Sequence, residues 1–402
     1  MAGALSGLKI VELGEMASAP YAAKLMADMG AEVIKIERTG AGDRARTRGP
    51  FPGGEPHPEK SGLFLYLNTN KLGVTLDVAR PEGFALLEQL VAGADIVIHN
   101  VAPADMDRIG LTFDRLRARN PRLVMTSITP WGLSGPKRNW CAEDLTMWSA
   151  GGLCYVNGGG PQHPEMPPLR TFGQQSGFQG GVHAAVATMG AIFAAERDGQ
   201  GQHVDVSIYE TLTSTMELFF EFWPYMGMVT SRLGQKPIQP LEAMECRDGY
   251  IYVCCVEEHQ WRNFVELMGN PEWANEEIFS NRLQRGVNWD ALKVFLQEWV
   301  SQQSVLDLYK KAQARRIPFA PVSTMGDLLG SEHLKQRGFF VEIAQPVAGT
   351  HQYPGAPLKY SRTPWEIRRP APTLGQHNEE VFGSRLGLGT SRLAELRRAK
   401  VI

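Results

Sequence analysis

The chain has 402 residues, of which 43% are apolar and 21% are charged, a composition typical of a soluble globular protein. A formal net charge of −2 lacks the basic footprint of nucleic-acid-binding proteins, so we expect no nucleic-acid partner. The length exceeds one compact core and indicates two domains, or one large α/β domain with an insertion.

The sequence carries no signal for a membrane, secretion, a disulfide framework or a metal site. No apolar run reaches the ~18 residues of a membrane span, and residues 1–6 lack a secretory pattern. The five cysteines form no CxxC pair, and the histidines lack metal-ligand spacing. We therefore expect a reduced, cytoplasmic, metal-free protein with no membrane partner. Cys141 is interpreted as a packing residue rather than a thiol nucleophile, because no basic partner is indicated nearby.

The first 130 residues alternate apolar strands with helical patterns. We predict strands at 8–13, 32–37, 74–77, 96–98 and 123–128, and helices at 21–29, 81–92 and 104–120. Consecutive strand, helix and strand require parallel strands and a right-handed crossover. The alternation therefore predicts a doubly wound α/β sheet.

The remaining chain continues this pattern and then changes character. The expected elements are a helix from Asp144, a Gly- and Pro-rich loop at 158–168, a small-residue helix at 177–197, a strand at 203–208 and a buried aromatic helix at 211–228. After a linker-like stretch at 234–240, the pattern indicates a smaller α+β domain with a strand at 249–256 and helices at 258–268, 289–301 and 305–315. Residues 330–372 are expected to be irregular, with a last helix near 391–399.

Common nucleotide and hydrolase motifs are absent. Gly14 is the only glycine in the turn after the first strand, so the dinucleotide fingerprint is incomplete, and the chain has neither a P-loop nor a GxSxG elbow. The glycine-rich turn at 39–43 is flanked by Arg38, Arg44, Arg46 and Arg48. Its backbone N–H and guanidinium groups suit an anion, although an exposed basic loop is the more frequent role of such a segment.

Asp144 has two interpretations from its residue type and position. An aspartate at a helix start most often satisfies backbone N–H groups and the helix dipole. A catalytic role for this carboxylate needs further support from the surrounding sequence.

That support comes from segments that occur in collinear order along nearly the whole chain. They include GLKIVEL at 7–13, APY at 19–21, MADMGAEVIKIER at 26–38, LNTNK at 67–71, ADIVIHN at 94–100, DRIGL at 107–111, ARNPRLV at 118–124, WGLSGP at 131–136, EDL at 143–145, GQHVDVS at 201–207, DGYI at 248–251 and IPFAPV at 317–322. Together they resemble the class III CoA-transferases, a family that includes formyl-CoA transferase, carnitine CoA-transferase and the related α-methylacyl-CoA racemases.

The resemblance implies a fold and an assembly. The expected fold is α/β, with a Rossmann-like parallel-sheet domain that binds CoA and a smaller α+β domain. The large domain is expected to be discontinuous, comprising residues 1–225 plus 331–402, with the small domain at 234–330. The family also implies an interlocked homodimer of two ring-shaped chains.

The resemblance places functional roles on matched positions. Asp144 falls on the nucleophilic aspartate. The CoA-binding positions fall on Arg38, Lys71, Arg108 and Asn100. Basic side chains there suit the phosphate groups of CoA. Ala17 and Ser18, with the backbone near 99–100, match the part of the family's site that lines the thioester and the reacting carboxylate.

The implied activity is transfer of CoA from an acyl-CoA donor to a carboxylic acid acceptor. It proceeds through an acyl-aspartyl anhydride and an aspartyl-CoA thioester on Asp144, with CoA as substrate and no permanently bound cofactor. The racemase branch is the nearest alternative, but it has a histidine where Glu143 stands and a second acid where residues 171–175 stand. A CoA-binding homologue without turnover is the other alternative.

The sequence does not define the acid that is activated. Trp131, Trp140 and Trp148 lie near Asp144 in sequence and are candidates for the substrate pocket. The aromatic residues at 219–225 are interpreted as helix core rather than pocket. Residues 235–240 replace a glycine-rich loop of formyl-CoA transferase, which argues against oxalate and formate as substrates.

Overall fold

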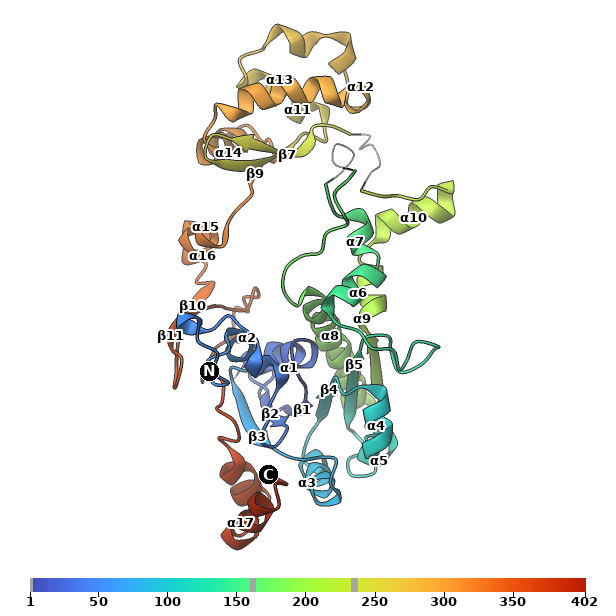
Figure 1. The fold of residues 1–402 in the computed structure, drawn as a ribbon, viewed down its shortest axis with the longest axis vertical. Coiled ribbons are helices and arrows are strands. Elements are labelled where there is room, and N and C mark those ends of the chain that lie inside the picture. Colours follow the sequence, from blue (N-terminus) through green and yellow to red (C-terminus); the bar gives the residue numbers. More distant parts are fainter. Residues whose placement is uncertain (1–2, 160–163, 233–237) are drawn as a thin grey trace. The chain divides into compact units, whose positions relative to one another are not determined.

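The computed structural model describes residues 3–159, 164–232 and 238–402 (Figure 1). The chain divides into two compact units. The large unit comprises Met1–Gly158, Met166–Ser231 and Gly338–Ile402, and the small unit comprises Gly159–Glu165 and Arg232–Arg337. The chain thus leaves the large unit once for a long excursion and returns to it at Gly338.

The large unit is built on a parallel sheet of six strands in the order β3-β2-β1-β4-β5-β6. Its strands are β1 (Lys9–Leu13), β2 (Glu32–Glu37), β3 (Lys71–Thr75), β4 (Ile96–His99), β5 (Val124–Thr129) and β6 (His203–Ser207). This is the doubly wound Rossmann order, so the predicted fold class is confirmed. Strand order reverses between β1 and β4, and ligands of such sheets bind at the carboxyl ends of the strands beside this switch point.

Alternation along the strands creates two cores. Ile10 and its neighbours Val33 and Ile96 pack on one face, whereas the adjacent Val11 and Ile34 pack on the other. The first face carries α1 (Ser18–Asp28), α6 (Asp144–Ala150), α8 (Gln175–Asp198) and α9 (Ile208–Ser214). The second carries α3 (Pro81–Ala92), α4 (Pro103–Ile109), α5 (Phe113–Arg117), the π-helical segment Glu379–Arg385 and α17 (Thr390–Arg398).

Helix α8 alone, among the described residues, is long and apolar enough to cross a membrane by length and composition. It packs against α1, β5 and β6. Its small side chains make this close packing possible.

Three expectations about local structure are wrong. The predicted helix at 104–120 is two helices, because Gly110 adopts a left-handed conformation with φ of 70° between α4 and α5. The predicted buried helix at 211–228 is α9 followed by α10 (Glu217–Met226), and α10 exposes 60% of Phe220 and 80% of Tyr225. The tail predicted to be irregular contains a hairpin of β10 (Phe340–Gln345) and β11 (Gly349–Pro354).

The small unit has its own sheet and core, as its α+β sequence pattern indicates. Antiparallel β7 (Leu241–Cys246), β8 (Gly249–Cys254) and β9 (Ala320–Pro321) pack with α11 (Glu258–Leu267), α13 (Trp289–Ser301) and α14 (Val305–Ala314). Helix α12 (Arg282–Val287) packs against α13. Two short helices, α15 (Met325–Gly330) and α16 (Glu332–Gln336), follow. The remaining short helices, α2 (Gly62–Leu67) and α7 (Leu153–Val156), belong to the large unit. Most of the predicted linker at 234–240 lies outside the described residues.

Candidate active site

Asp144 is the first residue of α6, and its side chain is only 6% exposed. The preceding residue, Glu143, has extended backbone angles, so the helix begins at the aspartate. The Asp144 carboxylate does not serve merely as the solvent-facing first-turn acid that its position suggests. It forms hydrogen bonds with residues that follow it by 26 and 32 positions.

Ser176 donates twice to one oxygen of this carboxylate. Its backbone N–H lies 2.8 Å from Asp144 Oδ1, and its hydroxyl donates to the same oxygen. Ser176 belongs to the first turn of α8, whose N-cap residue, Gln174, makes no capping bond through its side chain. The first N–H groups of a helix lack partners within the helix, and the helix dipole favours an anion there. Asp144 thus caps α8 from another helix.

The other oxygen faces a guanidinium group. Arg170 Nη1 lies 3.4 Å from Asp144 Oδ2 and donates to the carbonyl of Gly173 at 3.2 Å. The Arg170 side chain is 38% exposed. Among the described residues, its Nε and Nη2 have no hydrogen-bond or ion-pair partner. The two oxygens of Asp144 therefore have different surroundings.

Glycines in α8 bring this carboxylate to the switch point of the sheet. A Cβ on Gly177 would lie 2.9 Å from the Cβ of Ala17, and one on Gly181 would lie 2.7 Å from the carbonyl oxygen of Ser18. Side chains at these positions would force α8 away from α1. The structure therefore places Ala17 and Ser18 beside the first turn of α8, which holds Asp144.

Asn100 organises the loop that carries Ala17 and Ser18. Its amide donates to the carbonyl of Glu15 at 2.7 Å and to Ser18 Oγ at 3.0 Å, and its Oδ1 accepts from the N–H of Glu15 at 2.9 Å. These bonds join the carboxyl ends of β1 and β4 across the switch point. They commit the Asn100 side chain to the loop, whereas the resemblance implies contact with CoA.

Arg38 lies at the carboxyl edge of the sheet, just after β2. It is 59% exposed and its Nε lies 2.8 Å from Glu15 Oε1, while Arg44 Nε lies 2.7 Å from Glu15 Oε2. Two accessible guanidinium groups thus flank the loop after β1. Arg108 is 63% exposed on α4 and pairs with Asp105 at 2.9 Å. Among the described residues, no contact joins Arg108 to this group.

Lys71 occupies a different environment. It opens β3 at the amino end, paired in register with Val33, and its side chain is fully buried. Its ammonium lies 2.7 Å from Glu12 Oε2 and donates to the carbonyl of Pro20 at 2.8 Å and to Asn68 Oδ1 at 2.9 Å. Burial lowers the pKa of Lys71 to about 8, although Glu12 opposes the shift. An ammonium with three protein oxygens around it has no free donor for a phosphate.

Lys71 is one member of a buried ionic cluster that lies under the loop at 14–18. Lys35 Nζ is 3.0 Å from Glu12 Oε1 and 2.9 Å from Asp43 Oδ2, and it donates to the carbonyl of Gly14 at 2.7 Å. Asp43 Oδ1 accepts from the N–H of Met16 at 2.9 Å. Met16 has φ of 61°, a strained conformation for a residue with a side chain. The cluster holds the loop in this conformation.

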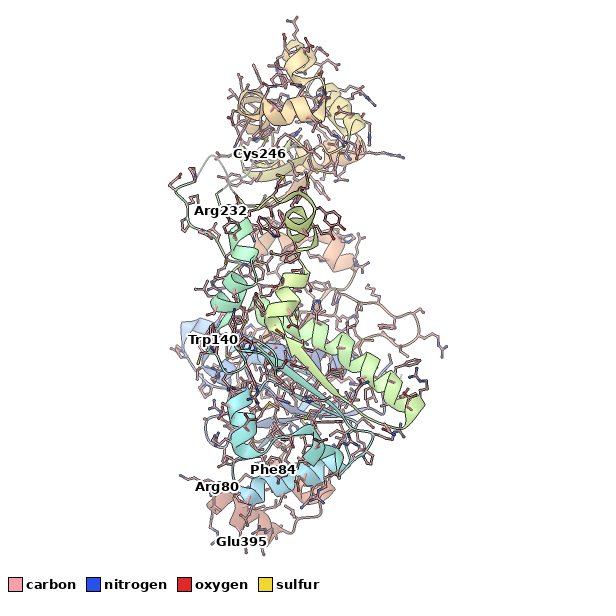
Figure 2. All side chains as sticks on the ribbon, turned by 90° about the vertical axis from the view of Figure 1, so that its right-hand side faces the viewer. Arg80, Phe84, Trp140, Arg232, Cys246 and Glu395 are labelled. Carbon is pink, nitrogen blue, oxygen red and sulfur yellow. The ribbon has the colours of Figure 1, made fainter. Side chains whose placement is uncertain are left out.

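The three candidate tryptophans are not equivalent. Trp140 is 59% exposed, on the loop before α6 (Figure 2), and its ring meets that of Trp131 edge to face at 6.3 Å. Lys137 Nζ lies 4.8 Å from the centre of the Trp131 ring. Trp148 is buried in the core against α8 and α9, and its indole N–H has no acceptor among the described residues.

Sequence reasoning missed Ser176, Arg170 and the ionic cluster. Charged residues inside two apolar strands were the available signal for the cluster, since Glu12 and Lys35 stand in register. Cys141 is exposed, so its expected packing role is wrong. Within the described part of the chain, no group of three or more His, Cys, Asp or Glu residues could hold a metal ion.

Comparison with known proteins defines the family. A family model described as CoA-transferase family III matches residues 5–378. The chain therefore belongs to CoA-transferase family III, and its enzyme class is that of the CoA-transferases.

Named relatives match along nearly their whole length. The chain is 28% identical over 407 residues to the succinyl-CoA–L-malate CoA-transferase beta subunit of Chloroflexus aurantiacus, covering 99% of this chain and 98% of the relative. It is 30% identical over 422 residues to the formyl-CoA:oxalate CoA-transferase of Streptomyces coelicolor, covering both completely. A crystal structure of a CAIB/BAIF family protein from Brucella suis superposes with a TM-score of 0.85 at 27% identity, over 96% of this chain and 100% of that one.

Proposed function

We propose that this protein transfers CoA from an acyl-CoA donor to a carboxylic acid through covalent intermediates on Asp144. The observation that carries the proposal is a nearly buried carboxylate with two differently placed oxygens, in a chain that belongs to CoA-transferase family III. The carboxylate sits at the start of α8 beside the switch point of the sheet, where doubly wound folds bind ligands.

The first half-reaction moves CoA onto the enzyme. A carboxylate oxygen of Asp144 bonds to the thioester carbon, the C–S bond breaks, and CoA leaves as a thiolate. The thiolate then attacks Cγ of Asp144, the bond from Cγ to the bridging oxygen breaks, and the donor acid leaves with that oxygen. The product is an aspartyl-CoA thioester.

The second half-reaction reverses these steps with the acceptor. Its carboxylate attacks Cγ of the thioester and expels the thiolate, which gives a second mixed anhydride. The thiolate attacks the acceptor's acyl carbon, and Asp144 leaves as a carboxylate. Each step exchanges oxygen for sulfur at a carbonyl carbon, so electrons balance without an oxidant, a reductant or a permanently bound cofactor.

The basic residues at the carboxyl edge supply the CoA site. Arg38 and Arg44 offer accessible guanidinium groups on either side of Glu15, and guanidinium forks match phosphate oxygens. We assign Lys71 and Asn100 to positioning of the loop at 14–18, since their side chains are committed to protein oxygens and N–H groups. Arg108 remains a proposed phosphate ligand on the strength of its exposure and the family resemblance.

The acid acceptor is proposed to carry a second carboxylate. Acylation of Asp144 removes its negative charge and leaves Arg170 without its counterion. A half-buried guanidinium favours a new anion in that state, and a dicarboxylic acid presents one while its other carboxylate reacts. A relative named for succinyl-CoA and L-malate fits this class.

Two alternatives make different predictions. A racemase needs two bases around the α-carbon of its substrate. Among the described residues, the side chains hydrogen-bonded to the Asp144 carboxylate are those of Ser176 and Arg170, and neither supplies a second base beside it. The Glu143 side chain is 70% exposed. A binding protein without turnover would hold acyl-CoA and release no new thioester.

The assembly is proposed to be an interlocked homodimer. The exposed aromatic side chains of α10, among them Phe220 and Tyr225, provide apolar surface that an isolated chain leaves in water. Native mass spectrometry should give a dimer that persists on dilution. A monomer at micromolar concentration would contradict this assembly. Cytoplasmic location stays a prediction.

The experiment for the function is a transfer panel. Succinyl-CoA, acetyl-CoA and formyl-CoA are each mixed with L-malate, oxalate and butyrate, and the last two donors also with succinate; the new thioesters are separated by liquid chromatography. Asp144→Asn is the matched control, because its amide oxygen still accepts from the N–H of Ser176. We expect transfer by the native chain and none by the variant. Solvent deuterium at the α-carbon without transfer would indicate the racemase instead.

A further inference from the structure

We infer that Ser176 makes the two carboxylate oxygens of Asp144 chemically distinct: its N–H and hydroxyl retain Oδ1 as an oxyanion site, and Oδ2 attacks the thioester. This inference rests on the proposed function and names the atoms that perform it. Family membership alone does not assign either role.

The donors around the carboxylate are unequally distributed. Oδ1 accepts from both the backbone N–H and the hydroxyl of Ser176, a residue that is 2% exposed. Oδ2 has only Arg170 Nη1 at 3.4 Å, from a side chain that solvent reaches. An oxygen that accepts two hydrogen bonds is the poorer nucleophile, because attack would weaken both bonds. Oδ2, which has a single contact at 3.4 Å, is therefore the better nucleophile of the two.

The chemistry gives Oδ1 a second task. When the thiolate or the acceptor attacks Cγ, negative charge develops on the oxygen that is not bridging. If Oδ2 bridges, that oxygen is Oδ1, and two donors already point at it. Preorganised donors of this kind stabilise a tetrahedral intermediate, and loss of one costs about 10²–10³-fold in kcat. The start of the 24-residue helix α8 adds a favourable dipole.

A consequence concerns the fate of each oxygen during turnover. Oδ2 leaves in the donor acid and is replaced by an oxygen of the acceptor. Oδ1 stays on the enzyme unless the carboxylate rotates about its Cβ–Cγ bond. Rotation would break both bonds from Ser176 in a buried site. Repeated turnovers should therefore replace one oxygen of Asp144 and not both.

Isotope labelling tests this directly. The full-length protein turns over succinyl-CoA with excess succinate that carries ¹⁸O in all carboxylate positions. The mass of the peptide that contains Asp144 is then measured by mass spectrometry. If succinyl-CoA is not a donor, the fastest acyl-CoA of the transfer panel and its own labelled acid replace it. One ¹⁸O at Asp144, a gain of about 2 Da that does not increase with further turnovers, is the expected result.

The other outcomes are separable. Two ¹⁸O atoms would show that the oxygens exchange places and would overturn the inference, while leaving the covalent mechanism intact. Transfer without any ¹⁸O at Asp144 would overturn the proposed mechanism itself. Asp144→Ala is the control for label elsewhere in the peptide.

Ser176→Ala tests the hydroxyl separately. We expect kcat to fall about 100-fold with little change in KM for the acyl-CoA, because the donor acts on Asp144 and not on CoA. Ser149→Ala is the matched control, since Ser149 lies on α6 with Asp144 and its hydroxyl contacts Cys154 instead. An unchanged kcat in Ser176→Ala would overturn the oxyanion role.

Discussion

Gly177 and Ala17 approach so closely that a Cβ on the glycine would lie 2.9 Å from the Cβ of the alanine. This approach joins two parts of the site that the sequence separates by 160 residues, the loop after β1 and the helix start that holds Asp144. Small residues in α8 are therefore a requirement of the site, and their effect on stability is measurable.

Gly181→Ala should destabilise the fold. The new methyl group would lie 2.7 Å from the backbone oxygen of Ser18, so α8 must shift, and such overpacking costs about 1–3 kcal/mol. Gly190→Ala lies on the same helix with open space around it and should instead stabilise by about 0.5–1 kcal/mol. Urea unfolding of both variants measures the difference. Equal effects would show that the helices do not touch at Gly181.

The free energy of unfolding should decrease as the pH is lowered below about 6.5, because of His99. Burial lowers the pKa of His99 in the folded chain to about 3, and the nearby His203 contributes a smaller part of the shift. In the unfolded chain the residue titrates near 6.5. Between these two pKa values, His99 binds a proton in the unfolded chain but not in the folded chain. The stability that neutral His99 contributes above pH 6.5 is therefore lost as the pH falls. From pH 7.5 to 5 this residue should cost about 2 kcal/mol.

The measurement for His99 is urea unfolding of the native chain and His99→Gln over this pH range. Their difference in stability should shrink by the amount given above as the pH falls. A His99 imidazole that titrates near its usual pKa in nuclear magnetic resonance spectra of the folded protein would contradict the argument.

Lys35→Met should be far more damaging than Lys71→Met. Removal of Lys35 leaves Asp43 Oδ2 without its ammonium partner and the carbonyl of Gly14 without its hydrogen-bond donor. An uncompensated buried charge costs about 3–5 kcal/mol of stability. Lys71 already loses its proton readily at about pH 8, so its neutral replacement should cost less at that pH. Thermal unfolding at pH 8 ranks the two. A smaller loss for Lys35→Met would show that the loop does not depend on this cluster.

Arg38→Ala should raise KM for acyl-CoA about 10-fold and leave kcat nearly unchanged, since phosphate binding is shared by ground and transition states. Added salt should raise KM for the native enzyme and reduce the difference in KM between the native enzyme and Arg38→Ala. Arg197→Ala removes a comparably exposed arginine, paired with Asp198 at the far end of α8, and should have no effect. A fall in kcat with constant KM would place Arg38 in the chemical steps instead.

Arg170→Gln should alter the choice of acceptor. We expect kcat/KM for succinate to fall at least about 10-fold more than kcat/KM for butyrate, because only succinate presents a second carboxylate to the guanidinium. Parallel assays with both acids on one enzyme preparation measure the ratio. An unchanged ratio would mean that Arg170 only orients Asp144 in the resting enzyme.

The sequence predicted the sheet well and the support of the site poorly. Apolar strands between amphipathic helices are a local pattern, so the parallel doubly wound sheet could be anticipated. The nucleophilic role of Asp144 was predicted from the family resemblance of the segments around it. Ser176 could not be anticipated, because it stands 32 residues further along the chain and its role arises only when α8 docks beside α6.

Local patterns also misled where tertiary context decides. The aromatic run in α10 predicted burial, yet a single chain leaves Phe220 and Tyr225 exposed. The resemblance assigns Lys71 to CoA binding, and this stays a prediction; in the structure Lys71 opens β3 with its ammonium buried against Glu12. A basic residue type does not reveal whether its charge is available to a ligand.

We propose that Asp144 becomes covalently bound during transfer. The most direct measurement is the mass of the intact protein and of its Asp144 peptide after brief incubation with succinyl-CoA, or with the best donor of the panel, followed by hydroxylamine. We expect an aspartyl hydroxamate at Asp144 that is absent without acyl-CoA and absent in Asp144→Asn. Full transfer activity with an unmodified Asp144, or with the nucleophile replaced, would contradict it.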